Sequence, residues 1–98
     1  IQPIKLGLDF INDLNPITYK WKKKKEGKAD FTHYGIVPQE VVETLKDYGI
    51  TSLEDFAGIT HDGEEESYYG ARYTEFIPIL MKAIQELSAE IKELKEKI

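Results

Sequence analysis

The apolar residues change their spacing along the chain, and each spacing predicts a different element. Between residues 6 and 14 they recur at helical intervals until Pro16, which steers the residue before it away from helical backbone. A second apolar stripe at helical spacing follows Pro38, a residue that suits the first turn of a helix, and ends before Gly49, which favours the left-handed stop. We therefore expect two short amphipathic helices in the first half of the chain.

Strand patterns lie between these helices. From 17 to 21, Ile, Tyr and Trp alternate with polar residues, which places Tyr19 and Trp21 on the inner face of a strand. Residues 22–28 are polar and contain a glycine, so they predict a turn, and residues 31–37 predict a strand that returns antiparallel. Together these segments predict a hairpin.

A second hairpin is expected further along the chain. Ser52 is placed to cap a single turn before it. Residues 58–61 and 68–73 have strand character and flank the acidic loop 62–66. This loop resembles a calcium loop only in its acidity, because it lacks the spacing of an EF-hand.

The C-terminal stretch has the strongest pattern, with apolar residues spaced alternately three and four apart. We call these seven residues the seam: Ile77, Leu80, Ile84, Leu87, Ile91, Leu94 and Ile98. This spacing is typical of a coiled coil and predicts an oligomer interface. Thr74 is the expected N-cap. Phe76, Ile79 and Met81 fall off the seam, so we expect them to pack the helix onto the sheets.

The combined prediction is an α+β fold, with small antiparallel hairpins packed with short helices and then a long C-terminal coiled-coil helix. Residues 1–73 would form the globular domain and 74–98 the oligomerisation helix. Glu90 and Lys95 occupy positions whose pairing favours parallel chains. Ile and Leu at the two seam positions favour a dimer when taken alone. The alternative interpretation is a long helix that belongs to the core of a monomer.

Composition narrows the classes of function. A chain of 98 residues forms one compact domain, too small for a dinucleotide-binding enzyme. The net charge of −5 divides into +3 over residues 1–30 and −8 over residues 31–98, which argues against a binder of duplex nucleic acid. The chain contains no cysteine, and no apolar run has the length of a membrane span. Because it begins with Ile1 and its one methionine is Met81, we expect a longer parent polypeptide.

Candidate chemistry is sparse. Neither Ser52 nor Ser88 has a plausible triad around it. His33 and His61 are far apart and belong to no cluster with metal-ligand spacing. The lysine run 22–25 is interpreted as a solvated turn. We therefore predict no catalytic residue, no metal site and no cofactor in this chain.

Three ordered motifs carry a family resemblance. They are Gly7-Leu8-Asp9-Phe10-Ile11-Asn12 leading to Asn15-Pro16-Ile17-Thr18-Tyr19-Lys20-Trp21-Lys22, then Gly35-Ile36-Val37-Pro38-Gln39-Glu40-Val41, then Tyr73-Thr74-Glu75-Phe76-Ile77-Pro78-Ile79-Leu80 continuing into Lys82-Ala83-Ile84-Gln85-Glu86-Leu87. In order and spacing the chain resembles the C-terminal intramolecular chaperone domain of bacteriophage tail spikes, tail fibres and endosialidases. It departs from that family at Pro38, where a small residue is usual.

The resemblance implies a homotrimer that helps the preceding β-rich fibre or spike domain of the same polypeptide to fold and then removes itself by autoproteolysis. It implies a virion precursor made in the host cytoplasm and released on maturation. From the charge and the lack of a long apolar run, we expect no nucleic-acid or membrane partner. A serine and a lysine upstream of the first helix carry the cut in the family, and this sequence starts after them. Gln39 and Glu40 would support that processing site or cap their own helix. The alternatives are an autoprocessing serine peptidase whose nucleophile lies before Ile1, and an unrelated coiled-coil adapter.

Overall fold

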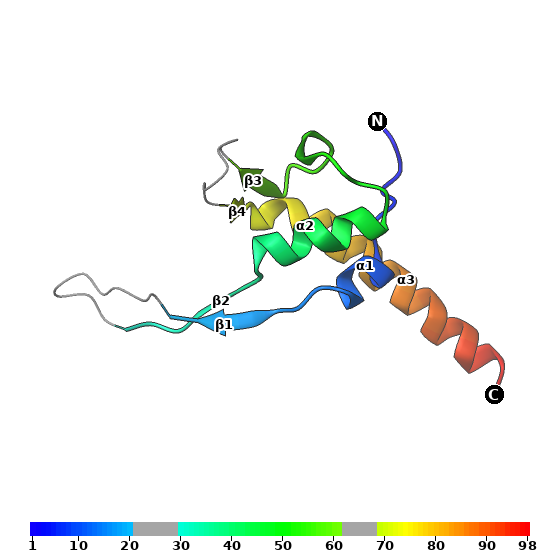
Figure 1. The fold of residues 1–98 in the computed structure, drawn as a ribbon. Helices are drawn as coiled ribbons and strands as arrows, with labels where there is room; N and C mark the ends of the chain where they lie inside the picture. Colours follow the sequence, from blue (N-terminus) through cyan, green and yellow to red (C-terminus); the bar gives the residue numbers. More distant parts are fainter. Residues whose placement is uncertain (21–29, 62–68) are drawn as a thin grey trace.

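The computed structural model describes residues 1–20, 30–61 and 69–98. Figure 1 shows a small body of helices and one hairpin, a second hairpin that extends away from the body, and a long C-terminal helix. The elements in chain order are α1 (Leu8–Asn12), β1 (Ile17–Tyr19), β2 (His33–Gly35), α2 (Pro38–Asp47), the 3₁₀ turn η1 (Leu53–Asp55), β3 (Ile59–His61), β4 (Tyr69–Ala71), the 3₁₀ turn η2 (Tyr73–Glu75) and α3 (Phe76–Glu96). The mixed α+β class is confirmed.

Both hairpins are antiparallel, as expected. β1 pairs with β2 so that Ile17 lies opposite Gly35, and β3 pairs with β4 so that Ile59 lies opposite Ala71. Each described strand has three residues, which is shorter than its apolar pattern predicted. The predicted turn 22–28, Trp21 and the acidic loop 62–66 lie outside the described residues.

The body is held together by one apolar cluster that draws on most of the elements. Its buried members are Leu6, Phe10, Val41, Leu45, Phe56, Ile59, Phe76 and Ile79. The ring of Phe10, which is fully buried, meets the rings of Tyr48 and Phe56 edge to face at centroid distances of 5.5 and 6.2 Å. Phe56 meets Phe76 in the same way at 5.5 Å. Edge-to-face geometry suits the aromatic quadrupole, so these contacts stabilise the packing of α1 against α3 beyond the area they bury.

The hairpin of β1 and β2, which we call the arm, does not pack against the helices as predicted. It projects from the body, whereas the hairpin of β3 and β4 lies against α2 (Figure 1). The prediction that Tyr19 faces an interior is also wrong: its side chain is 37% exposed and its ring stacks on His33 at 5.3 Å. Alternation of apolar and polar residues predicts burial only where another layer covers one face of the sheet. Among the described helices and strands, none packs broadly on the arm.

Helix α2 begins and ends where the sequence predicts. Pro38 is its first residue, so the residue that departs from the family pattern leaves the helix intact. At the other end Gly49 has a φ of +80°, the amide of Ile50 donates to the carbonyl of Leu45, and that of Gly49 donates to the carbonyl of Lys46. These are the hydrogen bonds of a Schellman motif, which requires a left-handed residue at this position. The Oγ of Ser52 then accepts the amide of Glu54 at 3.3 Å and caps η1, as expected.

Helix α3 begins two residues later than predicted. Residues 73–75 form η2, and Glu75, whose backbone is helical, occupies the N-cap position without a side-chain cap. The prediction of Thr74 as N-cap is therefore wrong. Pro78 is the third residue of α3, where a backbone amide has no partner within the helix. Its missing N–H thus costs no hydrogen bond.

Candidate functional site

Helix α3 carries two apolar stripes with the same alternating spacing, offset by one residue. The first stripe consists of Phe76, Ile79 and Ala83, whose side chains are 6%, 4% and 4% exposed. These residues pack α3 onto α1 and the rest of the core. Phe76 and Ile79 were predicted to pack the helix onto the sheets. Both are buried in the core, but among the described elements α3 packs mainly on α1. Because successive helical residues are about 100° apart, the second stripe faces a different direction.

The second stripe is the seam, and every one of its residues is exposed in the single chain. The exposed fractions are Ile77 53%, Leu80 43%, Ile84 66%, Leu87 45%, Ile91 45%, Leu94 61% and Ile98 104%. Contiguous exposed apolar surfaces of this kind are rare on monomeric domains and are typical of interaction sites. Six of the seven residues, from Ile77 to Leu94, lie along one face of α3, and Ile98 follows the end of the helix at Glu96.

Met81 lies beside the seam and is 56% exposed. The prediction that it packs the helix onto the sheets is therefore wrong. Met81 follows Ile79 by two residues, about 200° around the helix, so it lies on the flank away from the domain. It broadens the exposed apolar face next to Ile77 and Leu80.

The C-terminal part of α3 leaves the body of the protein. Every residue from Ile84 to Ile98 is exposed, and Figure 1 shows this part of the helix extending past α1. The 21 residues of α3 span roughly 32 Å at about 1.5 Å per residue. An isolated helix of the projecting length is marginal in water, and its stability normally comes from a packed apolar face. No helix in the described part of the chain is long and apolar enough to cross a membrane.

A polar contact fixes the start of the chain to α3. The Oε1 atom of Glu86 accepts a hydrogen bond from the backbone amide of Leu8 at 3.1 Å, at the first turn of α1. Gly7 lies directly against this carboxylate, and a Cβ at that position would overlap Oε1. The sequence did not reveal this contact, because its partners are 78 residues apart and neither is unusual in its local pattern.

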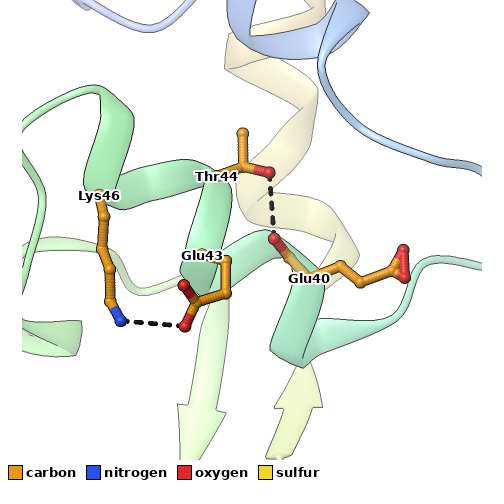
Figure 2. A network of polar contacts seen from close by, with 4 residues as sticks. All are labelled: Glu40, Glu43, Thr44 and Lys46. Carbon is orange, nitrogen blue, oxygen red and sulfur yellow. Dashed lines mark hydrogen bonds and ion pairs between the residues drawn. The ribbon is translucent and has the colours of Figure 1, made fainter.

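Gln39 and Glu40 lie on the exposed first turn of α2. The Nδ2 of Asn15 donates to Oε1 of Glu40 at 3.5 Å, and the hydroxyl of Thr44 donates to the Glu40 carbonyl at 3.0 Å. Figure 2 shows the Glu40 carboxylate directed away from the neighbouring ion pair of Glu43 and Lys46, whose atoms are 2.9 Å apart. Neither residue caps the helix, since the N-cap position is Val37, although the negative charge of Glu40 suits the first turn.

Glu40 also forms part of the wall of a small pocket at the base of the arm. The pocket has a volume of about 160 Å³ and is lined by Asp13, Leu14, Asn15, Ile36, Val37, Glu40, Val41 and Thr44. One wall is fixed by Tyr48, whose hydroxyl donates to Oδ2 of Asp13 at 2.6 Å. This hydrogen bond, with burial and the nearby negative charges of Asp13, Asp9 and Asp47, raises the pKa of Tyr48 to about 12.

The described residues contain no arrangement of a nucleophile with a general base. The hydroxyl of Ser52 caps η1, and Ser88 is exposed on α3. A third serine, Ser67, lies outside the described residues. Over the same described ranges, no three His, Asp or Glu side chains are grouped so that they would hold a metal ion.

The comparisons with known proteins give one finding. A family model described as chaperone of endosialidase matches residues 1–50. The match spans α1, the arm and α2, and it includes Gln39 and Glu40 but not the seam. No curated protein and no solved structure matches the chain.

Proposed function

The chain belongs to the chaperone of endosialidase family, and on this basis we propose that it is an intramolecular chaperone and trimerisation module of a phage tail spike or tail fibre. Its client is the β-rich domain that precedes it in the same polypeptide. The module is made with the virion precursor in the host cytoplasm and is released by autoproteolysis upstream of Ile1. The single observation that carries the assembly role is the exposed seam of α3.

The seam supports a parallel homotrimer. Its Ile and Leu positions alone favour a dimer, but Met81 extends the apolar face to one side over the first half of α3. A broader face is covered more completely by two neighbouring helices than by one. In a parallel arrangement Glu90 of one chain faces Lys95 of the next, which favours equal register although such exposed pairs contribute little energy.

Fixed register is what a β-fibre needs from such a module. Strands from separate chains pair slowly because non-local contacts form only after a long loop has closed, and a shift of one residue reverses every side chain. Three α3 helices that pack early hold their chains at high local concentration and in one register. The upstream strands then pair between chains that are already aligned.

The arm is the surface best suited to contact the client. Two aromatic residues there are exposed: Tyr34 (81%) on β2 and Phe31 (67%) two residues before that strand. Exposed aromatics on a projecting element offer apolar contact to a partly folded chain. The residue pattern did not predict this surface, because alternation of apolar and polar residues indicated a hairpin packed with the helices.

The processing step belongs to the parent polypeptide. A serine and a lysine located before Ile1 would supply the nucleophile and base, and Glu40 with Gln39 would support that site from the first turn of α2. The position of Glu40 beside a pocket that opens at the base of the arm supports this role. An autoprocessing serine peptidase is thus compatible with the chaperone, whereas an unrelated coiled-coil adapter would need neither the arm nor Glu40.

Light scattering on the purified chain tests the assembly. We expect a mass near three times 11.3 kDa. Replacing Leu87 and Ile91 together by Glu should give the mass of one chain, because each buried charge would lack a partner. The matched control adds two charges to the same helix away from the seam, at Gln85 and Ala89, and should remain trimeric. A wild-type mass near twice 11.3 kDa contradicts the trimer, and a monomer contradicts the seam as an interface.

A further inference from the structure

Over residues 1–20 and 30–61, the arm is joined to the body by two single chain segments, and neither β1 nor β2 packs broadly on a described helix. One segment is Asn15–Pro16, before β1, and the other is Ile36–Val37, between β2 and α2. Asn15 reaches Glu40 through a hydrogen bond of 3.5 Å, at the outer limit of such bonds, and the pocket lies between the two segments. A hairpin with three described residue pairs, on which no other described element packs broadly, does not fix its own direction.

Tyr73 contacts the arm from the other side of this junction. The amide of Ile36 donates to the Tyr73 hydroxyl at 3.4 Å, which is also near the outer limit, so the closer constraint is the packing of this hydroxyl against Gly35. A Cβ on Gly35 would lie 2.5 Å from the Tyr73 oxygen and 3.3 Å from the ring of Tyr19. The φ of Gly35 is not positive, so glycine is required here for space between these two rings and not for its backbone conformation.

The opposite end of Tyr73 is attached to the core. Its ring lies 6.4 Å from that of Phe76, a buried residue that packs on Phe56. Tyr73 belongs to η2, which continues directly into α3, and the first seam residue, Ile77, follows it by four positions. The same side chain therefore contacts the end of β2 and the start of the helix that carries the seam.

We propose that Tyr73 is a positioning residue that sets the direction of the arm relative to α3. This inference rests on the proposed function and extends it: the direction of the client-contacting arm is coupled to the helix that assembles. The hydroxyl blocks one side of the junction at Gly35 and accepts the amide of Ile36, while the ring is held by Phe76. When the α3 helices pack, each arm is thereby held at one angle to the bundle.

Distance measurements between two spin labels test this proposal. The chain contains no cysteine, so Thr18→Cys on β1 and Gln85→Cys on the exposed side of α3 introduce two unique labelling sites. Labelled chains are diluted with unlabelled ones so that pulsed electron spin resonance reports distances within one chain. For the doubly labelled chain with Tyr73 and Gly35 unchanged, we expect a single narrow distance distribution.

Tyr73→Phe removes the hydroxyl and keeps the ring on Phe76. We expect this variant to broaden the distribution and shift its mean, with the unfolding midpoint nearly unchanged. Tyr34→Phe removes an exposed hydroxyl on the same arm and should leave the distribution as it was. Gly35→Ala, in which Tyr73 is intact but displaced by the new methyl group, should shift the mean and provides a second test should Tyr73→Phe fail to fold.

A distribution that is unchanged in both Tyr73→Phe and Gly35→Ala overturns the proposal, as does equal broadening in Tyr34→Phe. The mass from light scattering separates this outcome from a failure of the proposed function. If the arm responds to Tyr73 in a chain that is not trimeric, the positioning role stands and the trimer does not. If the chain is trimeric and the distance distribution does not respond to Tyr73→Phe or Gly35→Ala, the proposed trimer stands and the positioning role of Tyr73 does not.

Discussion

Two isoleucines on α3 allow the different roles of its two stripes, core packing and assembly, to be tested with the same substitution. Ile79 is 4% exposed and packs in the core, whereas Ile84 is 66% exposed and belongs to the seam. Both lie inside the helix, so Ile→Ala changes the intrinsic helix propensity equally at the two positions. Any difference between the variants therefore reports what each side chain contacts.

The two substitutions are expected to change the folding free energy of a single chain by very different amounts. Ile79→Ala removes buried methyl groups and leaves a cavity, which costs about 2–5 kcal/mol of folding free energy in each chain. For a domain of this size, about 1 kcal/mol shifts the melting temperature by roughly 4–8 °C, so a fall of at least about 8 °C is expected. Ile84→Ala should change the stability of a single chain by no more than about 0.5 kcal/mol, since the side chain is exposed.

For the stability of the assembly, the expected order of the two variants is reversed: Ile84→Ala should have the larger effect. If the seam buries Ile84, its loss costs about 2 kcal/mol per chain and acts three times in one trimer, or roughly 6 kcal/mol. Because about 1.4 kcal/mol corresponds to a factor of ten, the dissociation constant of the trimer should rise by about four orders of magnitude. Ile79→Ala should affect it only through the folding of the domain.

Urea unfolding and sedimentation velocity, each over a hundredfold range of protein concentration, separate the two effects. Ile84→Ala should make both the mass and the unfolding midpoint depend strongly on concentration, because association stabilises the folded chain by mass action. Ile79→Ala should lower the midpoint at every concentration. The reasoning fails if Ile84→Ala destabilises the dilute chain as much as Ile79→Ala does, or if Ile79→Ala leaves the midpoint unchanged.

Three further predictions concern the domain. In a spectrophotometric titration, Tyr48→Phe should remove the phenol that ionises near pH 12; the raised pKa means that its contact with Asp13 is complete below about pH 10 and is lost as the pH rises toward 12, and an unchanged high-pH step in the variant would contradict this. Gly7→Ala should displace the Glu86 carboxylate and speed hydrogen exchange at the amide of Leu8, with little change in trimer mass; slow exchange in the variant would refute the contact. The isolated chain should leave added unfolded or fibre-derived polypeptides intact, as judged by mass spectrometry, and specific cleavage would contradict the prediction that it contains no catalytic residue.

Local chemistry predicted the helices well and the burial of the arm badly. Pro38 and Gly49 act within one or two turns of the chain, so their effect is readable without knowledge of the fold. The prediction for Tyr19 needed a second layer over the hairpin, and whether such a layer exists depends on how distant segments pack. A period of two residues identifies a strand but does not say which face, if either, is covered.

In the candidate site, too, local patterns were predictable from the sequence and long-range contacts were not. The heptad spacing predicted which residues share one exposed face of α3 from Ile77 to Leu94, because a helix converts spacing directly into position on one face; their role as an interface stays a prediction. It misplaced Met81, since being off the seam does not specify which flank of the helix a residue occupies. The contacts of Glu86 with Leu8 and of Tyr73 with Ile36 join residues 78 and 37 positions apart, and no local pattern signals either of them.

The two stripes of α3 are offset by one residue. Because of this offset, the domains in any ring assembled through the seam can be arranged with only one handedness. The domain is attached about 100° around the helix from the seam and so lies to one side of it, not opposite. In a closed parallel bundle every domain would then lean in the same rotational sense, toward the flank of the next chain that carries Met81. The mirror-image ring would require Phe76, Ile79 and Ala83 to leave the core. The fold of each single chain would thus determine the handedness of the assembled particle before any two chains associate.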